Sequence, residues 1–181
     1  MKKVLMGLIA LVMCLSSFKG IAQNSLSVIT DEMVNDQMVS LVTAAKENFQ
    51  NDMSKEEFTK IADIGEKFLE MEEGNALLDQ VFADCKNNVQ EEEIRNRDNS
   101  VLKKVFLRFI LLANTNEQLN EVSFSFAKMT FYQPKKKTWF QKAVSFLVHI
   151  FTTAVTNNNP NLKPIMDTTA KYADTLIYHN K

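Results

Sequence analysis

Histidine, cysteine and glutamate are the side chains of this sequence best suited to catalysis or metal binding. Nucleophilic catalysis needs a base beside the nucleophile, and the histidines are His149 and His179. His149 lies in the apolar run 146–151, where we expect a histidine packed in a helix or at its edge. Together with Cys85, the two histidines are too few for the four Cys or His ligands of a structural zinc site. The sequence therefore predicts neither a catalytic triad nor a zinc site.

Three glutamates offer the densest set of carboxylates at helical spacing. Glu66, Glu70 and Glu73 follow one another at steps of four and three, which places them on one face of a helix. Carboxylates bind calcium, but Lys67 lies between them, and such rows are usually solvated. The sequence has no Gly-rich phosphate loop and no EF-hand pattern. We therefore predict no enzymatic activity, no metal and no cofactor.

A basic and aromatic segment at 135–155 is the remaining candidate for a contact surface. Aromatic side chains beside lysines suit a membrane interface, and a long apolar stretch follows them. Gln141, Lys142 and His149 would make that stretch a poor permanent span. We prefer a packed helix within a globule and keep a membrane-active secreted protein as the alternative. The candidate residues for contact with a membrane or a partner are Lys135, Lys136, Lys137, Trp139, Phe140 and Lys142.

The first 22 residues have the three-part layout of a secretory signal peptide. A basic start at Lys2-Lys3 precedes an apolar run of 12 residues, and the small residues Gly20 and Ala22 precede a cut before Gln23. The run is shorter than the roughly 20 residues of a membrane span. The layout resembles that of exported proteins of Gram-negative bacteria. We expect cleavage after Ala22 and a periplasmic or secreted mature protein.

Residues 23–181 are expected to form a single all-α domain of five to six helices. Glycine is scarce there, with only Gly65 and Gly74, whereas sheets with tight turns need many more. Cys85 has no partner for an internal disulfide and lies in an apolar helical stripe, so we expect a buried thiol. Acidic residues dominate 23–98 and basic residues dominate 99–181, with 18 acids and 7 bases against 4 acids and 11 bases. Two helical layers that attract one another, or a basic half that faces phosphate or lipid, would both explain this asymmetry.

Capping residues predict where several helices begin. Thr30 opens the first helix, and Ser54 with Glu57 forms a capping box for the second. Thr115 with Gln118 forms another such pair after a break at 114–116. Thr138 caps a helix that runs to about Val155.

Composition predicts the remaining elements. Gly74 marks a helix stop or kink, and 91–100 is a polar connection. The stretch 101–113 is mostly apolar on all sides and predicts a central helix, whereas 119–132 fits a helix or a strand, with helix favoured. Pro164 opens the last helix.

The stretch that ends Phe131-Tyr132-Gln133-Pro134 echoes the earlier stretch from Ser54 to Leu78. Each is a capped helix, an aromatic turn and a second helix. The pattern resembles a family of small exported helical bacterial proteins of unknown function, whose capped helix ends F-Y-x-S-P-x-G-x-K. This sequence lacks the serine before Pro134 and the glycine after it. The resemblance implies a secreted helical fold and no activity.

These observations together predict an exported, non-enzymatic helical binding or interaction protein. Its partner would be an unknown protein or an apolar small molecule held between helices, since methionine and phenylalanine suit an adaptable apolar pocket. Nucleic acid is not expected, because acidic residues outnumber basic ones in 23–181 and the protein is exported.

Overall fold

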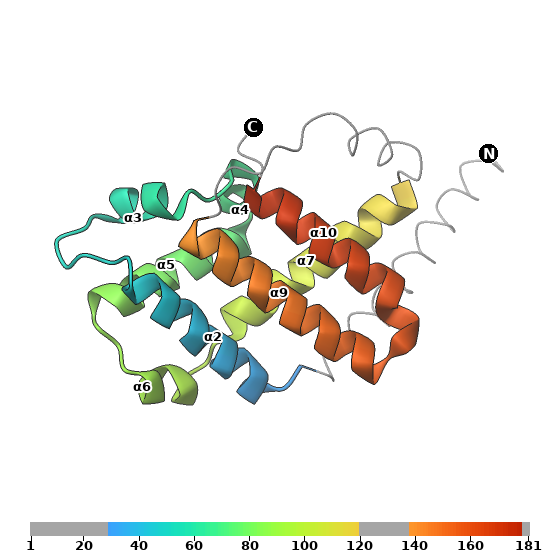
Figure 1. The fold of residues 1–181 in the computed structure, drawn as a ribbon, viewed down its shortest axis with the longest axis horizontal. Coiled ribbons are helices and arrows are strands. Elements are labelled where there is room, and N and C mark those ends of the chain that lie inside the picture. Colours follow the sequence, from blue (N-terminus) through green and yellow to red (C-terminus); the bar gives the residue numbers. More distant parts are fainter. Residues whose placement is uncertain (1–28, 120–137, 179–181) are drawn as a thin grey trace, which may run out of the picture.

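A computed structural model describes residues 29–119 and 138–178, and everything it describes that is regular is helical (Figure 1). This confirms the all-α fold class. The described ranges hold eight α-helices, slightly more than the five to six expected, because short helices occur between the long ones. The elements are α2 (Asp31–Lys46), α3 (Lys55–Ala62), α4 (Glu66–Glu70), α5 (Glu72–Lys86), α6 (Glu91–Asn96), α7 (Ser100–Leu119), α9 (Trp139–Asn158), the 3-10 turn η1 (Pro160–Leu162) and α10 (Lys163–Tyr178).

The long helices form two layers, and α9 lies in the middle of one of them. In Figure 1, α2, α9 and α10 run side by side with α9 in the middle, and α5 and α7 cross behind them. α10 contacts both α9 and α7, and α2 contacts α5, α6 and α9. No helix in the described ranges is long and apolar enough to cross a membrane.

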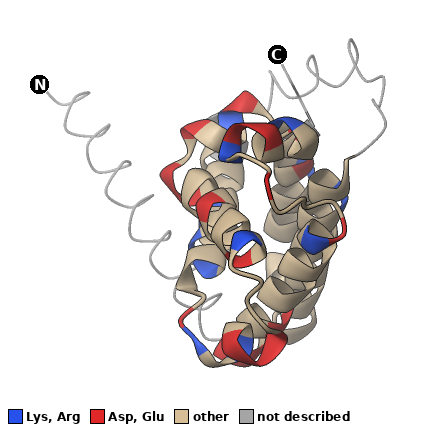
Figure 2. Cartoon of the chain, turned by 90° about the vertical axis from the view of Figure 1, so that its left-hand side faces the viewer, with Lys and Arg blue, Asp and Glu red and all other residues tan. Residues whose placement is uncertain are grey.

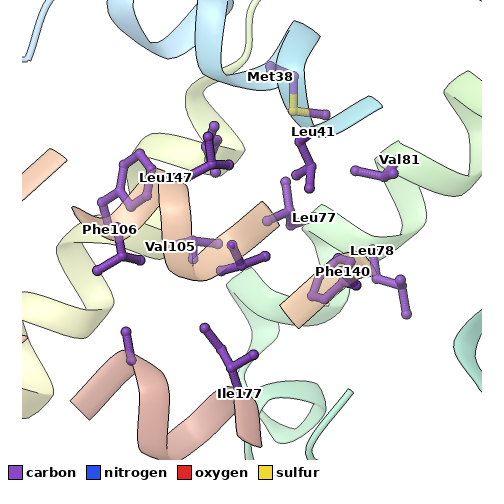
Figure 3. Packing of buried hydrophobic residues seen from close by; sticks show 14 of the residues in the cluster. Met38, Leu41, Leu77, Leu78, Val81, Val105, Phe106, Phe140, Leu147 and Ile177 are labelled. Carbon is purple, nitrogen blue, oxygen red and sulfur yellow. The ribbon is translucent and has the colours of Figure 1, made fainter. Parts of the chain in front are cut away.

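All five long helices contribute to one continuous core. Figure 3 shows side chains from these helices that meet between the layers. Phe106 of α7 stacks on Phe151 of α9 with 4.6 Å between ring centroids, and Phe68 meets Phe140 edge-on at 5.8 Å. Labelled core residues are Met38, Leu41, Leu77, Leu78, Val81, Val105, Phe106, Phe140, Leu147 and Ile177.

Three of the expected helix starts are confirmed. The Thr30 hydroxyl accepts from the Met33 amide at 3.1 Å, and the Ser54–Glu57 capping box is complete. Thr138 caps α9 and also donates to the Ala62 carbonyl at 2.6 Å. The buried Gln141 side chain completes a second capping box with Thr138 and donates to the Ile177 carbonyl at 3.1 Å. The start of α9 is therefore tied to α3 and α10.

The prediction of a helix stop at Gly74 is wrong. The break occurs at Met71, whose extended backbone ends α4 and begins α5, and Gly74 lies inside α5. A Cβ atom at Gly74 would lie 2.2 Å from the Phe68 carbonyl oxygen. Glycine is needed here for the close approach of α4, not to end a helix.

Two further sequence predictions are corrected along the chain. α7 continues through 114–116 to Leu119, and the Thr115 hydroxyl donates to the Leu111 carbonyl at 2.8 Å, so Thr115 lies within the helix and caps nothing. Part of the expected polar connection after Gln90 is the short helix α6, which buries Ile94. The helix-or-strand question at 119–132 is not answered, because all but Leu119 lies outside the described residues.

Acidic and basic residues are interspersed along the helices in the view of Figure 2. Most described ion pairs join residues within 29–98, such as Lys55 with Asp79 and Arg95 with Asp36. Lys103 and Asp31, at 3.4 Å, form the described pair that joins the acidic part of the chain to the basic part. Attraction between two charged layers is therefore a small contribution to the fold, since an exposed pair contributes about 0–1 kcal/mol.

A buried polar network joins α5 to the connection before α7. Asp84 is 3% exposed. Both terminal nitrogens of the Arg97 guanidinium donate to its carboxylate, with 2.6 Å between Nη1 and Oδ1. This hydrogen bond raises the pKa of Arg97. The amide of Asn99 donates to the Ile94 carbonyl at 2.6 Å and to the Asn35 side chain at 2.7 Å. The network therefore fixes α2, α5, α6 and α7 relative to one another.

We predict that Asp84→Ala lowers the free energy of unfolding by about 2–3 kcal/mol, because it leaves Arg97 without its carboxylate in a partly buried place. Asp79→Ala is the matched control, since Asp79 lies on the same helix and its pair with Lys55 is half exposed. That control should change stability by less than about 1 kcal/mol. Urea unfolding followed by circular dichroism measures both, and equal losses would contradict the assigned role of the network.

Candidate functional site

The structure separates the residues that the sequence proposed as a contact surface. Phe140 is fully buried, which contradicts its place on such a surface in the folded protein. Trp139 is partly buried and packs against Phe58 at 5.5 Å between ring centroids, whereas Lys142 is exposed. Lys135, Lys136 and Lys137 lie outside the described residues. Helical periodicity explains the split, because Phe140 points into the core from the same turn that brings Lys142 to the surface.

Trp139 and Lys142 belong to a groove that sequence reasoning did not identify. The groove lies between the second half of α2 and the first half of α9 and has a volume of about 760 Å³. This volume lies within the range of about 300–1,000 Å³ for ligand sites. Its lining residues are Ser40, Leu41, Ala44, Glu47 and Asn48 from α2 and the turn after it, and Trp139, Lys142, Ala143, Phe146 and Leu147 of α9.

Phe146 is the most exposed large apolar residue of this groove. Its side chain is 60% exposed, and Ile61 at 42% is the other large apolar residue exposed in the described ranges. The neighbouring Val144, Leu147 and Val148 are buried, so Phe146 lies on the opposite side of α9 from the core. A helical projection of 139–155 could have identified it, because it departs from the buried stripe that its neighbours define.

Charged side chains of opposite sign stand on the two walls of the groove. Glu47 follows the last turn of α2, and Lys142 lies on the first turns of α9. Neither forms an ion pair with another described residue. The polar neighbours Ser40 and Asn48 donate to backbone carbonyls of α2. The groove therefore combines an apolar floor with one cationic and one anionic wall.

The other side of α9 has a polar groove of about 410 Å³ shared with α10. The structure exposes His149 there, so the expectation of a packed or edge histidine is met only as an edge position. The hydroxyls of Thr152 and Thr153 donate to the His149 carbonyl and not to its ring. Lys163, Asp167 and Lys171 line the opposite wall. Among the described residues, no hydroxyl is hydrogen-bonded to the imidazole ring, as a nucleophile would be to its base.

The row of glutamates is divided between two helices. Glu66 and Glu70 belong to α4, whereas Glu73 follows the backbone break at Met71 and belongs to α5. Within 29–119 and 138–178, no three His, Cys, Asp or Glu side chains gather in a way that could hold a metal ion.

Cys85 is buried, as expected, and is 4% exposed. Burial raises the pKa of its thiol to about 11, with a smaller contribution from Asp84, and nearby Lys46 opposes the shift. The thiolate is the reactive form, so the folded environment suppresses both nucleophilic attack and disulfide exchange at this residue.

Comparison with known proteins adds no relative. The chain matches no family model, no curated protein and no solved structure. The groove must therefore be interpreted from its own residues.

We predict that Cys85 in residues 23–181 reacts at least about a hundredfold more slowly with Ellman's reagent at pH 8 when folded than when unfolded in urea. A pKa of about 11 leaves roughly a thousandth of the thiol ionised at that pH, and burial restricts access further. Equal rates in the two states would contradict the buried position. The urea sample is an internal control, because Cys85 is the one thiol in that part of the sequence.

Proposed function

We propose that this chain is an exported, non-enzymatic helical binding protein whose docking surface is the α2–α9 groove. The observation that carries the proposal is the exposed Phe146 beside this groove. Contiguous apolar surface is typical of interaction sites, and Phe146 lines this groove together with Trp139 and Ala143. The groove would accept apolar groups of a protein partner or of a small molecule.

The apolar surface of the groove supports binding of an occupant better than it supports catalysis. Full burial of a phenylalanine side chain contributes about 1.5–3 kcal/mol, and Phe146 still has most of that gain available. Partly buried Trp139 and Ala143 extend the apolar surface along α9. Ser40 and Asn48 are engaged with backbone carbonyls, which leaves Glu47 and Lys142 as the charged groups that face an occupant.

Export is the second part of the proposal. It is supported by the order of a basic start, a short apolar run and small residues before Gln23. The mature chain would act in the periplasm or outside the cell. The described residues form no disulfide. This is compatible with that location, because helix packing and the buried polar network stabilise the fold without one.

We predict that Phe146→Asp weakens binding of the apolar dye N-phenyl-1-naphthylamine by about tenfold, since it removes an apolar side chain and adds a charge to the groove. Ile61→Asp is the matched control, because Ile61 is exposed but lies outside the groove. A fluorescence titration of residues 23–181 at low protein concentration measures both. Unchanged binding in Phe146→Asp, or equal losses in both variants, would contradict the proposed docking surface.

We also predict that the full chain, produced in a Gram-negative host, yields a periplasmic or secreted product that begins at Gln23. Ala22→Arg should accumulate as the uncut precursor, because the cutting enzyme needs a small residue before the cut. Ala22→Ser keeps a small residue and should be processed normally. Intact-mass spectrometry distinguishes the products, and a wild-type product that retains residues 1–22 would contradict cleavage at this position.

A further inference from the structure

We propose that α3 is a lid over a second binding site, a pocket for a single aromatic ring that the lid's own Phe58 fills when it is closed. The proposal is independent of the docking surface proposed above, although Trp139 lines the α2–α9 groove and also contacts Phe58. It depends on the rings around Phe58, on the attachment of α3 to the bundle and on the different anchoring of its two ends.

The side chain of Phe58 is fully buried among three other aromatic rings. Its ring centroid lies 6.0, 5.4 and 5.5 Å from those of Phe49, Phe82 and Trp139. The rings meet at tilted or edge-on angles, which aromatic pairs prefer. The three surrounding rings are only partly buried, so they lie near the surface. The structure thus shows what this place accepts, which is one phenyl ring.

The surrounding rings do not depend on α3 for their positions. Phe82 belongs to α5 and Trp139 to α9, and Phe49 lies in the turn after α2. α2 packs on both α5 and α9, and all three helices belong to the main core. Phe49 and Phe82 also contact each other, with 5.8 Å between ring centroids. The walls of the pocket would therefore remain in place when α3 moves away.

α3 is the long-helix bundle's outlying neighbour. It lies at the edge of the molecule in Figure 1, and its main packing partners are α5 and α9. Of its eight residues only Phe58 and Ala62 are buried, whereas Ile61 is 42% exposed. Elements with few buried apolar contacts open at a lower free energy than the core helices. We therefore expect α3 to open while the rest of the described fold stays closed.

Local contacts allow α3 to move as a unit. Ser54 and Glu57 form its capping box, and Lys60 pairs with Glu56 at 2.6 Å one turn away. At the other end, the amide of Asp63 donates to the Lys60 carbonyl at 3.2 Å. All of these contacts lie within 54–63 and move with the segment.

The C-terminal end of α3 is the pivot of the lid. The Thr138 hydroxyl donates to the Ala62 carbonyl at 2.6 Å, and the Gln141 side chain donates to the Asp63 carbonyl at 2.9 Å. The backbone at Asp63 is left-handed, with φ at 46°. A residue other than glycine adopts this conformation at a cost, and such positions concentrate at segments that switch. This end stays joined to the start of α9 while the other end moves.

The N-terminal end of α3 is held less firmly. Lys55 pairs with Asp79 of α5, but both side chains are about half exposed, and exposed pairs contribute little. The preceding residues 50–52 are exposed, and the Met53 amide donates to the Gln50 carbonyl at 3.0 Å. These four residues span about 13 Å when extended, which gives the lid room to swing. Met53 is buried and would leave its place together with the ring of Phe58.

Hydrogen exchange of residues 23–181 measures the opening directly. We expect the hydrogen-bonded amides of α3 to exchange at least about tenfold faster than those of α7. Asp79→Ala should speed exchange in α3 about two- to fivefold, because it removes the contact at the moving end, and should leave α7 unchanged. Asp36→Ala is the matched control, since it removes a comparable exposed pair with Arg95 and should leave α3 unchanged.

Binding of 4-fluorobenzyl alcohol, followed by ¹⁹F NMR, tests the pocket. Phe58→Ala should bind this probe at least about tenfold more tightly than the wild-type chain, because the ring that competes for the pocket is gone. Ile61→Ala is the matched control, since it shortens an exposed side chain of the same helix and should bind like the wild type. In the wild-type chain, millimolar probe should speed exchange in α3 but not in α7, because it binds the open form.

Equal exchange rates in α3 and α7 would overturn the lid. A probe that leaves exchange in α3 unchanged, or that binds Phe58→Ala no better than Ile61→Ala, would overturn the pocket. If circular dichroism shows that Phe58→Ala is unfolded, exchange of the wild-type chain with and without probe decides. The docking surface is judged separately by dye binding to Phe146→Asp, so either proposal can fail while the other stands.

Discussion

The structure depends on one constraint, which is that α9 carries more apolar surface than its neighbours cover. Its inner face is buried against α7 and α10, with Phe140 near its start and Phe151 in its second half. α2 covers a further side but leaves a groove beside its second half. Trp139, Ala143 and Phe146 follow one another at steps of four and three along the side of α9 that lines this groove. The groove is therefore a consequence of a largely apolar helix at the centre of a small bundle.

The position of α2 decides how wide this groove is, and polar contacts hold α2 in place. Asn35 of α2 binds Asn99, which lies in the network of Asp84 and Arg97. The ammonium of Lys46 donates to the Val89 carbonyl after α5. Both contacts orient the helix against α5 and α6 and not against α9. Because polar groups buried without a partner are costly, such contacts fix the position of a helix more narrowly than apolar packing alone. These polar contacts outside the groove therefore help to fix the α2 wall, which also packs directly on α9.

Local chemistry makes the helix starts predictable, but long-range packing decides the rest. Thr30, Ser54 and Thr138 cap their helices because a hydroxyl at that position satisfies a free amide within the same turn. Gly74 misleads as a stop signal because its role is close approach to Phe68, which no local pattern reveals. The break expected at 114–116 fails for a different reason, since Thr115 can bond to the carbonyl four residues before it and continue the helix.

The candidate site is predictable in part. The sequence draws attention to Trp139 and Lys142, and both line the groove. It also points to Phe140, which helical periodicity assigns to the core once Val144 and Leu147 are recognised as buried. The α2 wall could not be predicted, because nothing in its own residues indicates which helix lies beside it. Pairing between distant helices is the information that a single sequence lacks.

Burial against a partner would have different free-energy consequences on the two sides of α9. This difference favours the α2 side as the proposed docking surface. The α10 side carries His149, Lys163, Asp167 and Lys171, whose polar and charged groups would lose hydration on contact with a partner. Desolvation of such groups can exceed what their pairing returns. The α2 side has an apolar floor and one charge of each sign at its edge, where water still reaches both. A single helix thus carries the proposed docking surface on one side and a polar groove on the other.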